Sequence, residues 1–303
     1  MSRVFLFLVC FAILLTGCGP GQNEQADSPS RGEINISVDE SFKPVIEEQL
    51  AMYKETYPAT NIRATYKTEA DCLRDIIRDS ATRMVIITRG LSEKEERYFK
   101  DSINYFPSWN MIARDGIAVI ASAQSNDTAF TMTQLAGFLT GKDTTRQVIF
   151  DGLNATSTYR FVKDSLLKGG SLDTNYVKAA SSTADVIDFV AANKSALGLI
   201  GISWIGNPEI PEQVQQLEKV KICYIRCEIC EGKPYVKPDQ QSISTYKYPL
   251  VRGLYYVLRE NYNGLGLGFA SFLRSERGQL IFRRFYLAPA MELDIRDVKI
   301  NLR

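Results

Sequence analysis

Three apolar runs separated by two helical patterns decide the fold of this chain: INISV at residues 34–38, NIRATY at 61–66 and RMVIIT at 83–88. Apolar residues recur at helical spacing between the first two runs, and a second helix is predicted over residues 69–79. The order strand, helix, strand, helix, strand is typical of a mostly parallel sheet covered by helices. We therefore expect an α/β fold.

Polar residues follow each of these three strands. Ser41 comes after the first strand, Thr68 and Glu69 after the second, and Thr88 and Arg89 after the third. In parallel α/β sheets ligands bind at the carboxyl ends of strands, beside helix N-termini, so these residues are candidate ligand contacts. A serine at the start of a helix is also an ordinary N-cap, and for Ser41 both roles remain open.

The rest of the chain continues to alternate between the two kinds of pattern. Further strands are predicted at residues 116–121, 147–150 and 197–202. Helices are predicted at residues 131–139, 159–167, 186–193, 255–261 and 270–285. The sequence contains no internal repeat.

The amino-terminal segment predicts export and lipid anchoring. An apolar run from Val4 to Leu15 follows Arg3; it is too short to cross a hydrocarbon layer of ~30 Å and is typical of a signal peptide. Leu15-Thr16-Gly17-Cys18 resembles the bacterial lipobox, whose cysteine becomes lipidated. We expect residues 1–17 to be a signal peptide and residues 18–31 a polar tether that begins at the lipidated Cys18. The protein would then be anchored to a bacterial membrane and face the periplasm or the cell exterior. The alternative is a plain signal peptide with a chance cysteine.

The composition argues against most catalytic chemistry. None of the 303 residues is histidine, which excludes Ser-His-Asp and Cys-His catalysis and His-ligated zinc. Carboxylate, Lys or Ser-Lys chemistry stays open. The formal net charge of +1 gives no global field that would attract nucleic acid. We predict no catalytic activity, no cofactor, no metal and no nucleic-acid partner.

Four cysteines follow Cys18 in the sequence: Cys72, Cys223, Cys227 and Cys230. A zinc site at the last three would need a fourth ligand, and no His can supply it. A redox site would need a strand-to-helix setting, which this segment does not resemble. We favour a disulfide among Cys223, Cys227 and Cys230, with the pairing open, and we expect Cys72 to be a buried thiol.

Several motifs occur in a characteristic order along the chain. They are SFKP at residues 41–44, TQLAGFLTGK at 133–142, LGLIG at 197–201, YPLVRGLY at 248–255 and FLRS at 272–275. Together they resemble the phosphate-binding proteins of bacterial phosphate ABC transporters, which have the type II periplasmic-binding fold. The resemblance extends from about residue 32 to residue 303.

The resemblance implies two lobes, each a mixed, mostly parallel sheet flanked by helices, joined by two hinge crossings. Lobe one would take residues 32–113 and 240–303, and lobe two residues 114–239. The ligand would lie in the cleft between them, and the lobes would close on it by a hinge motion.

The resemblance also implies site residues. Ser41 and Phe42 match the first phosphate-binding loop, and Ser157 and Thr158 match a helix start in the second lobe. Asn154 and Thr156 belong to that same second loop. Ordinary helix capping is the alternative role for these hydroxyl groups.

The chain departs from the family pattern at three positions. Arg89 stands where the family has an acidic residue that accepts a proton from phosphate, Thr68-Glu69-Ala70 replaces a Gly-Ser-rich loop, and Leu153 stands where an arginine is expected. Arg89 could supply the missing positive charge, and Glu69 could pair with Arg89 or accept the ligand's proton. Arg160 is a further candidate cation, or an ordinary solvated helix residue. If Glu69 faces the cleft, phosphate is favoured over sulfate; if it faces solvent, any tetrahedral oxyanion is open.

These observations predict a monomeric, lipid-anchored solute-binding protein. It would capture inorganic phosphate or a related oxyanion and deliver it to an ABC transporter permease. The alternative is a sensor or adaptor lipoprotein that uses the same fold with a degenerate ligand site. An enzyme would need a nucleophile–base pair in the cleft, and the sequence offers none.

Overall fold

The computed structural model of the protein describes residues 27–152 and 156–291. The predictions for the signal peptide, for Cys18 and for Asn154 lie outside these residues, as does most of the predicted tether. In the described part of the chain, none of the helices combines the length and the apolar character that crossing a bilayer requires.

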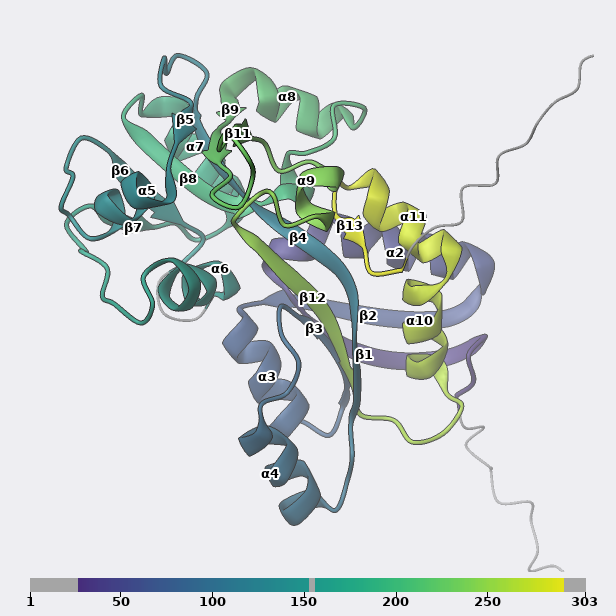
Figure 1. Cartoon of the computed structure of the whole chain (residues 1–303). Helices are drawn as coiled ribbons and strands as arrows, with labels where there is room; N and C mark the ends of the chain where they lie inside the picture. Colours follow the sequence, from purple (N-terminus) through teal and green to yellow (C-terminus); the bar gives the residue numbers. More distant parts are fainter. Residues whose placement is uncertain (1–26, 153–155, 292–303) are drawn as a thin grey trace, which may run out of the picture.

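One long mixed sheet runs through two lobes (Figure 1). The first lobe contains three parallel strands and a fourth, antiparallel strand, in the order β2 (Ala59–Lys67), β1 (Arg31–Asp39), β3 (Thr82–Ile87) and β12 (Val251–Leu258). The long β4 (Ser108–Ser122) pairs with β12 along residues 108–116 and with the second lobe along residues 117–121. The chain therefore crosses between the lobes along β4, which confirms the predicted two-lobed α/β architecture.

The second lobe continues the sheet beyond β4. Its three main strands are mutually parallel, in the order β8 (Ala196–Gly201), β6 (Gln147–Phe150) and β7 (Val177–Ala179). Two short strands, β9 (Val220–Ile222) and β13 (Ala288–Pro289), also pair with β4. A separate small sheet contains β5 (Ala129–Phe130), β10 (Tyr224–Arg226) and β11 (Tyr235–Val236).

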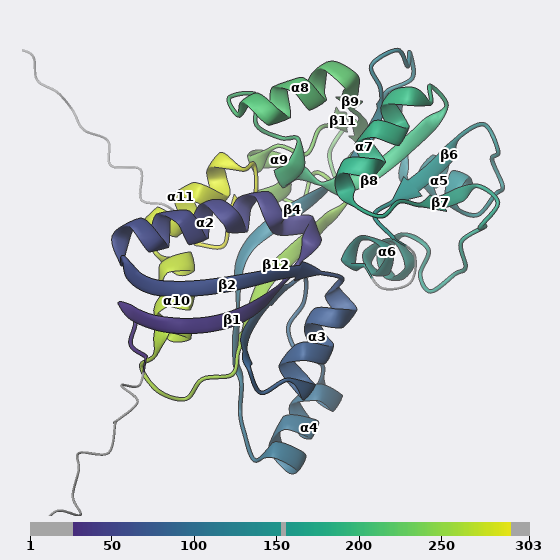
Figure 2. The same ribbon diagram turned by 180° about the vertical axis from the view of Figure 1, so that it is seen from behind.

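Helices cover both faces of the sheet (Figures 1 and 2). The first lobe carries α2 (Lys43–Thr56), α3 (Glu69–Arg78), α4 (Glu93–Ile103), α10 (Leu265–Arg274) and α11 (Glu276–Arg284). The second lobe carries α5 (Met132–Leu139), α6 (Ser157–Phe161), α7 (Thr183–Ala192) and α8 (Pro211–Lys219). The short α9 (Gln240–Ser244) precedes β12.

Strand β3 shows why the first lobe forms this layered sheet. Met84 and Ile86 pack with residues of α2 and α10, whereas Val85 and Ile87 pack with residues of α3 and α4 on the other face. A strand that is buried on both faces must be apolar along its whole length. The continuous run that predicted this strand is therefore the consequence of two helical layers.

One prediction about helices is wrong, and two others are correct only in part. Residues 255–261 do not form a helix, because Tyr255 to Leu258 belong to β12, which pairs with β3 and β4 on either side. The helix predicted at 159–167 is the short α6 followed by a π-helical turn, η2 (Val162–Leu166). The helix predicted at 270–285 is interrupted at Ser275, which ends α10 and caps α11.

The cysteine predictions are confirmed. Cys227 and Cys230 form the disulfide, within the turn that joins β10 to β11. Cys72 and Cys223 are buried free thiols. The pairing could not be read from the sequence, because it depends on which thiols the β10–β11 hairpin brings together.

Candidate functional site

A buried polar cluster forms where the two lobes meet. The first lobe contributes residues from the ends of β1 and β3 and from the start of α3, and the second lobe contributes the start of α6 (Figure 2). Ser41, Glu69, Thr88, Ser157 and Thr158 are each at most 5% exposed, although all are polar. The structure therefore brings together hydroxyl and carboxyl groups that lie far apart in the sequence.

Arg252 lies at the centre of this cluster and is 4% exposed. Its Nε donates to Asp115 Oδ2 at 2.8 Å, and its Nη1 donates to Ser157 Oγ at 2.8 Å and to Thr158 Oγ1 at 3.2 Å. Its guanidinium also stacks over the ring of Phe42 at 5.1 Å from the ring centroid. The remaining nitrogen, Nη2, is buried and has no hydrogen-bond partner among the described residues.

Sequence reasoning missed Arg252 and Asp115 as site residues. Arg252 lies inside the YPLVRGLY motif, and Asp115 precedes the apolar run at residues 117–121. The sequence signal that could have identified them is a charged residue inside an otherwise apolar strand. Because an unpaired charge is rarely buried, such a residue is expected to have a polar partner nearby. The pairing itself follows from β4 and β12 being neighbours, since Arg252 and Asp115 are register partners.

Ser41 faces the second lobe and does not cap α2. It lies in the 3-10 turn η1 (Glu40–Phe42), its backbone N–H donates to Asp39 Oδ1 at 3.0 Å, and Phe42 occupies the N-cap position of α2. Its hydroxyl donates to Asp151 Oδ2, 3.4 Å away in the second lobe. Its carbonyl accepts from Ser203 Oγ at 3.2 Å and from Trp204 Nε1 at 2.9 Å. The capping role for Ser41 is therefore wrong.

Glu69 pairs with Arg160 across the lobes. Arg160 Nε lies 2.6 Å from Glu69 Oε2, and Arg160 Nη2 lies 3.2 Å from Oε1 and 2.7 Å from Thr88 Oγ1. The backbone N–H and the hydroxyl of Thr88 both donate to Glu69 Oε1, at 2.9 and 2.5 Å. The suggested pairing of Glu69 with Arg89 is wrong, and Arg160 is more than a solvated helix residue.

Arg89 pairs with Glu95 instead of Glu69. Its two terminal nitrogens form a fork on Glu95, at 2.7 and 2.8 Å. Glu95 is also the acidic member of the capping box that starts α4 with Ser92. The structure therefore holds the Arg89 guanidinium at α4 rather than in the buried cluster.

The two remaining predicted hydroxyls act as helix caps. Thr68 Oγ1 accepts from the backbone N–H of Asp71 at the start of α3, and Thr156 Oγ1 accepts from that of Tyr159 at the start of α6. Ser157 and Thr158 in the first turn of α6 instead accept from Arg252. Thr68 and Thr156 thus fix the helices whose first turns enter the cluster.

Buried acids outnumber the cations in this cluster. Burial raises the pKa of Asp39 and that of Asp151 to about 6, although Arg252 opposes the shift in both. Burial also raises the pKa of Asp115. For Glu69, burial opposes ionisation, but the hydrogen bonds and the charge of Arg160 hold its pKa below the usual range. One oxygen each of Asp39 and Asp151 is buried without a partner among the described residues.

This arrangement can bind a small polar solute that both accepts and donates hydrogen bonds. Arg252 Nη2 offers a donor, and the partnerless oxygens of Asp39 and Asp151 offer acceptors. Among residues 27–152 and 156–291, no group of three or more Cys, Asp or Glu side chains is arranged to hold a metal ion.

A family model described as a PBP superfamily domain matches residues 23–277. The protein belongs to the PBP superfamily. The fold also resembles that of several solved structures. A substrate-binding protein assigned to phosphate ABC transport in Clostridium perfringens, solved with bound phosphate, is 19% identical with a TM-score of 0.70, and the match covers 86% of this chain and 100% of that one.

Two further solved structures have the same fold. An ABC-type phosphate transport receptor from Vibrio cholerae is 17% identical with a TM-score of 0.60, covering 85% of this chain and 100% of its own. The regulatory domain of a LysR-family regulator from Neisseria meningitidis is 12% identical with a TM-score of 0.54, covering 86% of this chain and 99% of its own. No curated protein matches the sequence. At these identities the neighbours establish the shared fold.

Proposed function

We propose that this PBP-superfamily protein is an extracytoplasmic solute-binding protein. It binds phosphate, or a similar tetrahedral oxyanion, in the buried cluster between the lobes and delivers it to an ABC transporter permease. The observation that carries the proposal is the buried Nη2 of Arg252 beside the first turn of α6, which has no hydrogen-bond partner within residues 27–152 and 156–291. A buried donor without an acceptor is costly, and an oxyanion would satisfy it. The transport neighbours from Clostridium perfringens and Vibrio cholerae support this function over that of a sensor or adaptor.

The surrounding acids favour phosphate over sulfate. Near neutral pH phosphate carries a proton, whereas sulfate carries none, so only phosphate can donate to a carboxylate. One oxygen each of Asp39 and Asp151, buried and without a partner in the part of the chain that the structure describes, is an acceptor of this kind. A sulfate at the same place would leave these acceptors unsatisfied, because it has no proton to donate. In this proposal Asp39 and Asp151, rather than Glu69, accept the ligand's proton.

We further propose that ligand entry requires the lobes to separate. The contacts that hold the lobes together around the cluster include those of Arg160 with Glu69, Ser41 with Asp151, and Arg252 with Ser157. The proposed lobes are residues 32–113 with 240–303, and residues 114–239. A hinge motion of this kind gives a permease two states to distinguish.

The remaining parts of the proposal concern location and assembly. A signal peptide over residues 1–17 and a lipidated Cys18 would place the protein outside the cytoplasm on a membrane, tethered by the residues up to 31. We propose that it acts as a monomer and binds its solute without chemical change. The buried hydroxyl of Ser157 accepts a hydrogen bond from Arg252, and an arginine cannot act as a general base for it.

Titration calorimetry of phosphate-free protein tests the proposal. Phosphate should bind, and Ser157→Ala should weaken binding by about tenfold, because this hydroxyl orients Arg252. The exposed Ser102→Ala on α4 is the matched control and should bind like the parent. Absence of heat with phosphate, sulfate and other tetrahedral oxyanions would refute the transport function and favour a sensor or adaptor.

A further inference from the structure

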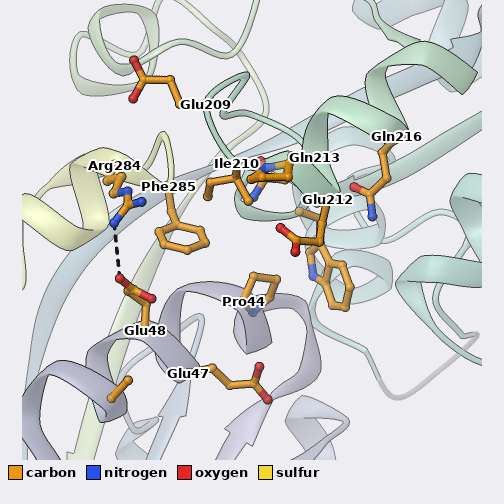
Figure 3. Close-up of a pocket in the computed structure, with 13 residues that line it drawn as sticks. Pro44, Glu47, Glu48, Glu209, Ile210, Glu212, Gln213, Gln216, Arg284 and Phe285 are labelled. Atoms are coloured by element: carbon orange, nitrogen blue, oxygen red, sulfur yellow. Dashed lines mark hydrogen bonds and ion pairs between the residues drawn. The ribbon is translucent and has the colours of Figure 1, made fainter. Parts of the chain in front are cut away.

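A groove separate from the buried cluster lies between α2, α8 and α11 (Figure 3). Its volume is about 580 Å³, which is within the usual range for ligand pockets. Pro44 and Glu47 on α2 form one wall, and Ile210 and Glu212 at the start of α8 form the other. Since α2 belongs to the first lobe and α8 to the second, the shape of the groove depends on how the lobes meet.

The floor of the groove is apolar, and one of its side chains is hydrogen-bonded to Ser41 of the candidate site. Phe285, which is 7% exposed, lines the floor together with Ile210 and Pro44. Trp204 also lines the groove, and its indole N–H donates to the carbonyl of Ser41. A molecule that occupies the groove would therefore contact Trp204, whose hydrogen bond holds the backbone of Ser41 in the candidate site.

The rim of the groove carries an excess of negative charge. Of its four glutamates, Glu48 pairs with Arg284 at 3.3 Å and Glu47 lies 3.9 Å from Lys43. Glu209 and Glu212 are exposed and form no ion pair with any residue that the structure describes. Gln216 adds a buried side-chain oxygen that has no hydrogen-bond partner in the same described ranges. The rim thus presents acceptors and carboxylates above an apolar floor.

We propose that this groove is the docking site for a Lys- or Arg-bearing segment of a partner protein. Basic side chains have apolar stems that can pack on Phe285 and Ile210, and charged heads that can reach Glu209 and Glu212. An acidic segment would be repelled, and a purely apolar one would desolvate the carboxylates without compensation. The proposal does not depend on which solute the buried cluster holds.

The two tryptophans of the chain provide the test. We would record the indole N–H signals of the full ¹⁵N-labelled chain in a zwitterionic detergent, without phosphate, while adding tetra-arginine. The Trp204 signal should shift with saturation. The Trp109 signal should stay in place, although its indole N–H donates to the carboxylate of Glu96. Tetra-citrulline, which is uncharged, should shift neither signal.

Two double variants with equal charge changes complete the design. Glu209→Gln/Glu212→Gln should weaken tetra-arginine binding by about fivefold or more, the loss expected for two partly solvated ion pairs. The control Glu55→Gln/Glu218→Gln alters the exposed outer faces of α2 and α8 and should bind like the parent. Equal weakening in both variants, or equal shifts of both indoles, would overturn the proposal. A Trp204 shift that follows protein concentration alone would assign the groove to a second copy, which also overturns it.

Discussion

Arg160 and Glu69 form an ion pair that joins the two lobes, with Arg160 Nε 2.6 Å from Glu69 Oε2. Glu69 has a side chain that is 3% exposed, whereas that of Arg160 is 35% exposed. The pair therefore neutralises a buried acid with a cation that reaches solvent. Its removal should change how the lobes associate more than how each lobe folds.

Arg160→Gln should open the unliganded protein. Without the cation, Glu69 would be a buried charge with no counter-ion, and separation of the lobes would return it to water. Small-angle scattering should then show a larger radius of gyration than for the parent. Arg74→Gln, which breaks the exposed pair with Asp71 on α3, is the control and should leave the radius unchanged. An unchanged radius in Arg160→Gln would show that this pair does not hold the lobes together.

Asp39→Asn should stabilise the unliganded protein at pH 7.5 and have little effect at pH 4. The pKa of Asp39 is raised to about 6 by burial, above the ordinary value of an unfolded aspartate, so the folded state binds more protons between about pH 4 and 6. The stability associated with the protonated carboxyl is complete below pH 4 and lost as the pH rises through 6. Asparagine keeps the oxygen that accepts from the Ser41 N–H and avoids the buried charge. The gain at pH 7.5 should be on the order of 1–3 kcal/mol in chemical denaturation. A loss of stability at pH 7.5 would contradict the account of this carboxyl.

Phosphate affinity should rise as the pH falls from 8 to 6. Over this interval phosphate gains a proton that it can donate to the acidic cluster. The carboxyl of Asp151, whose pKa burial raises to about 6, also gains a proton and so repels the anion less. In Asp151→Asn the carboxyl no longer titrates, so the dependence on pH should be shallower. Calorimetry at four pH values measures both slopes. Parallel slopes for the parent and the variant would remove Asp151 from the site.

Reduction of the disulfide should destabilise the protein locally and leave solute binding intact. The Cys227–Cys230 bond closes a very short loop in the β10–β11 turn. The entropy that such a bond removes from the unfolded chain predicts a stabilisation of about 2 kcal/mol. Denaturant unfolding with and without reductant measures the loss, and Cys227→Ser/Cys230→Ser should be insensitive to reductant. A drop in phosphate affinity on reduction would contradict the separation between this hairpin and the cluster.

The sequence predicted the elements whose pattern is set by burial on two faces. The strands β3, β6 and β8 read as apolar runs because helices cover both sides of the sheet. The sequence wrongly predicts a helix at β12, because Tyr255, Tyr256 and Leu258 also fit a helical spacing. The pairing with β3 and β4 that makes this segment a strand is non-local.

The candidate site was predictable in part. Ser41, Glu69, Thr88, Ser157 and Thr158 come together because strand ends and helix starts meet at one edge of an α/β sheet. Arg252 with Asp115, and Arg160 with Glu69, depend on contacts between residues more than 90 positions apart. Arg89 and Arg160 are both candidate cations in the sequence, and only the fold shows that Arg89 pairs with Glu95 and Arg160 with Glu69.

The central claim is that Arg252 Nη2 meets an oxyanion between the lobes. A crystal structure of the protein grown with phosphate and without sulfate tests this most directly. We predict a phosphate oxygen within hydrogen-bond distance of Arg252 Nη2, and a second oxygen beside Asp39 or Asp151. A phosphate-saturated crystal in which Arg252 Nη2 still lacks a partner, with no anion between Ser41 and Ser157, would contradict the claim.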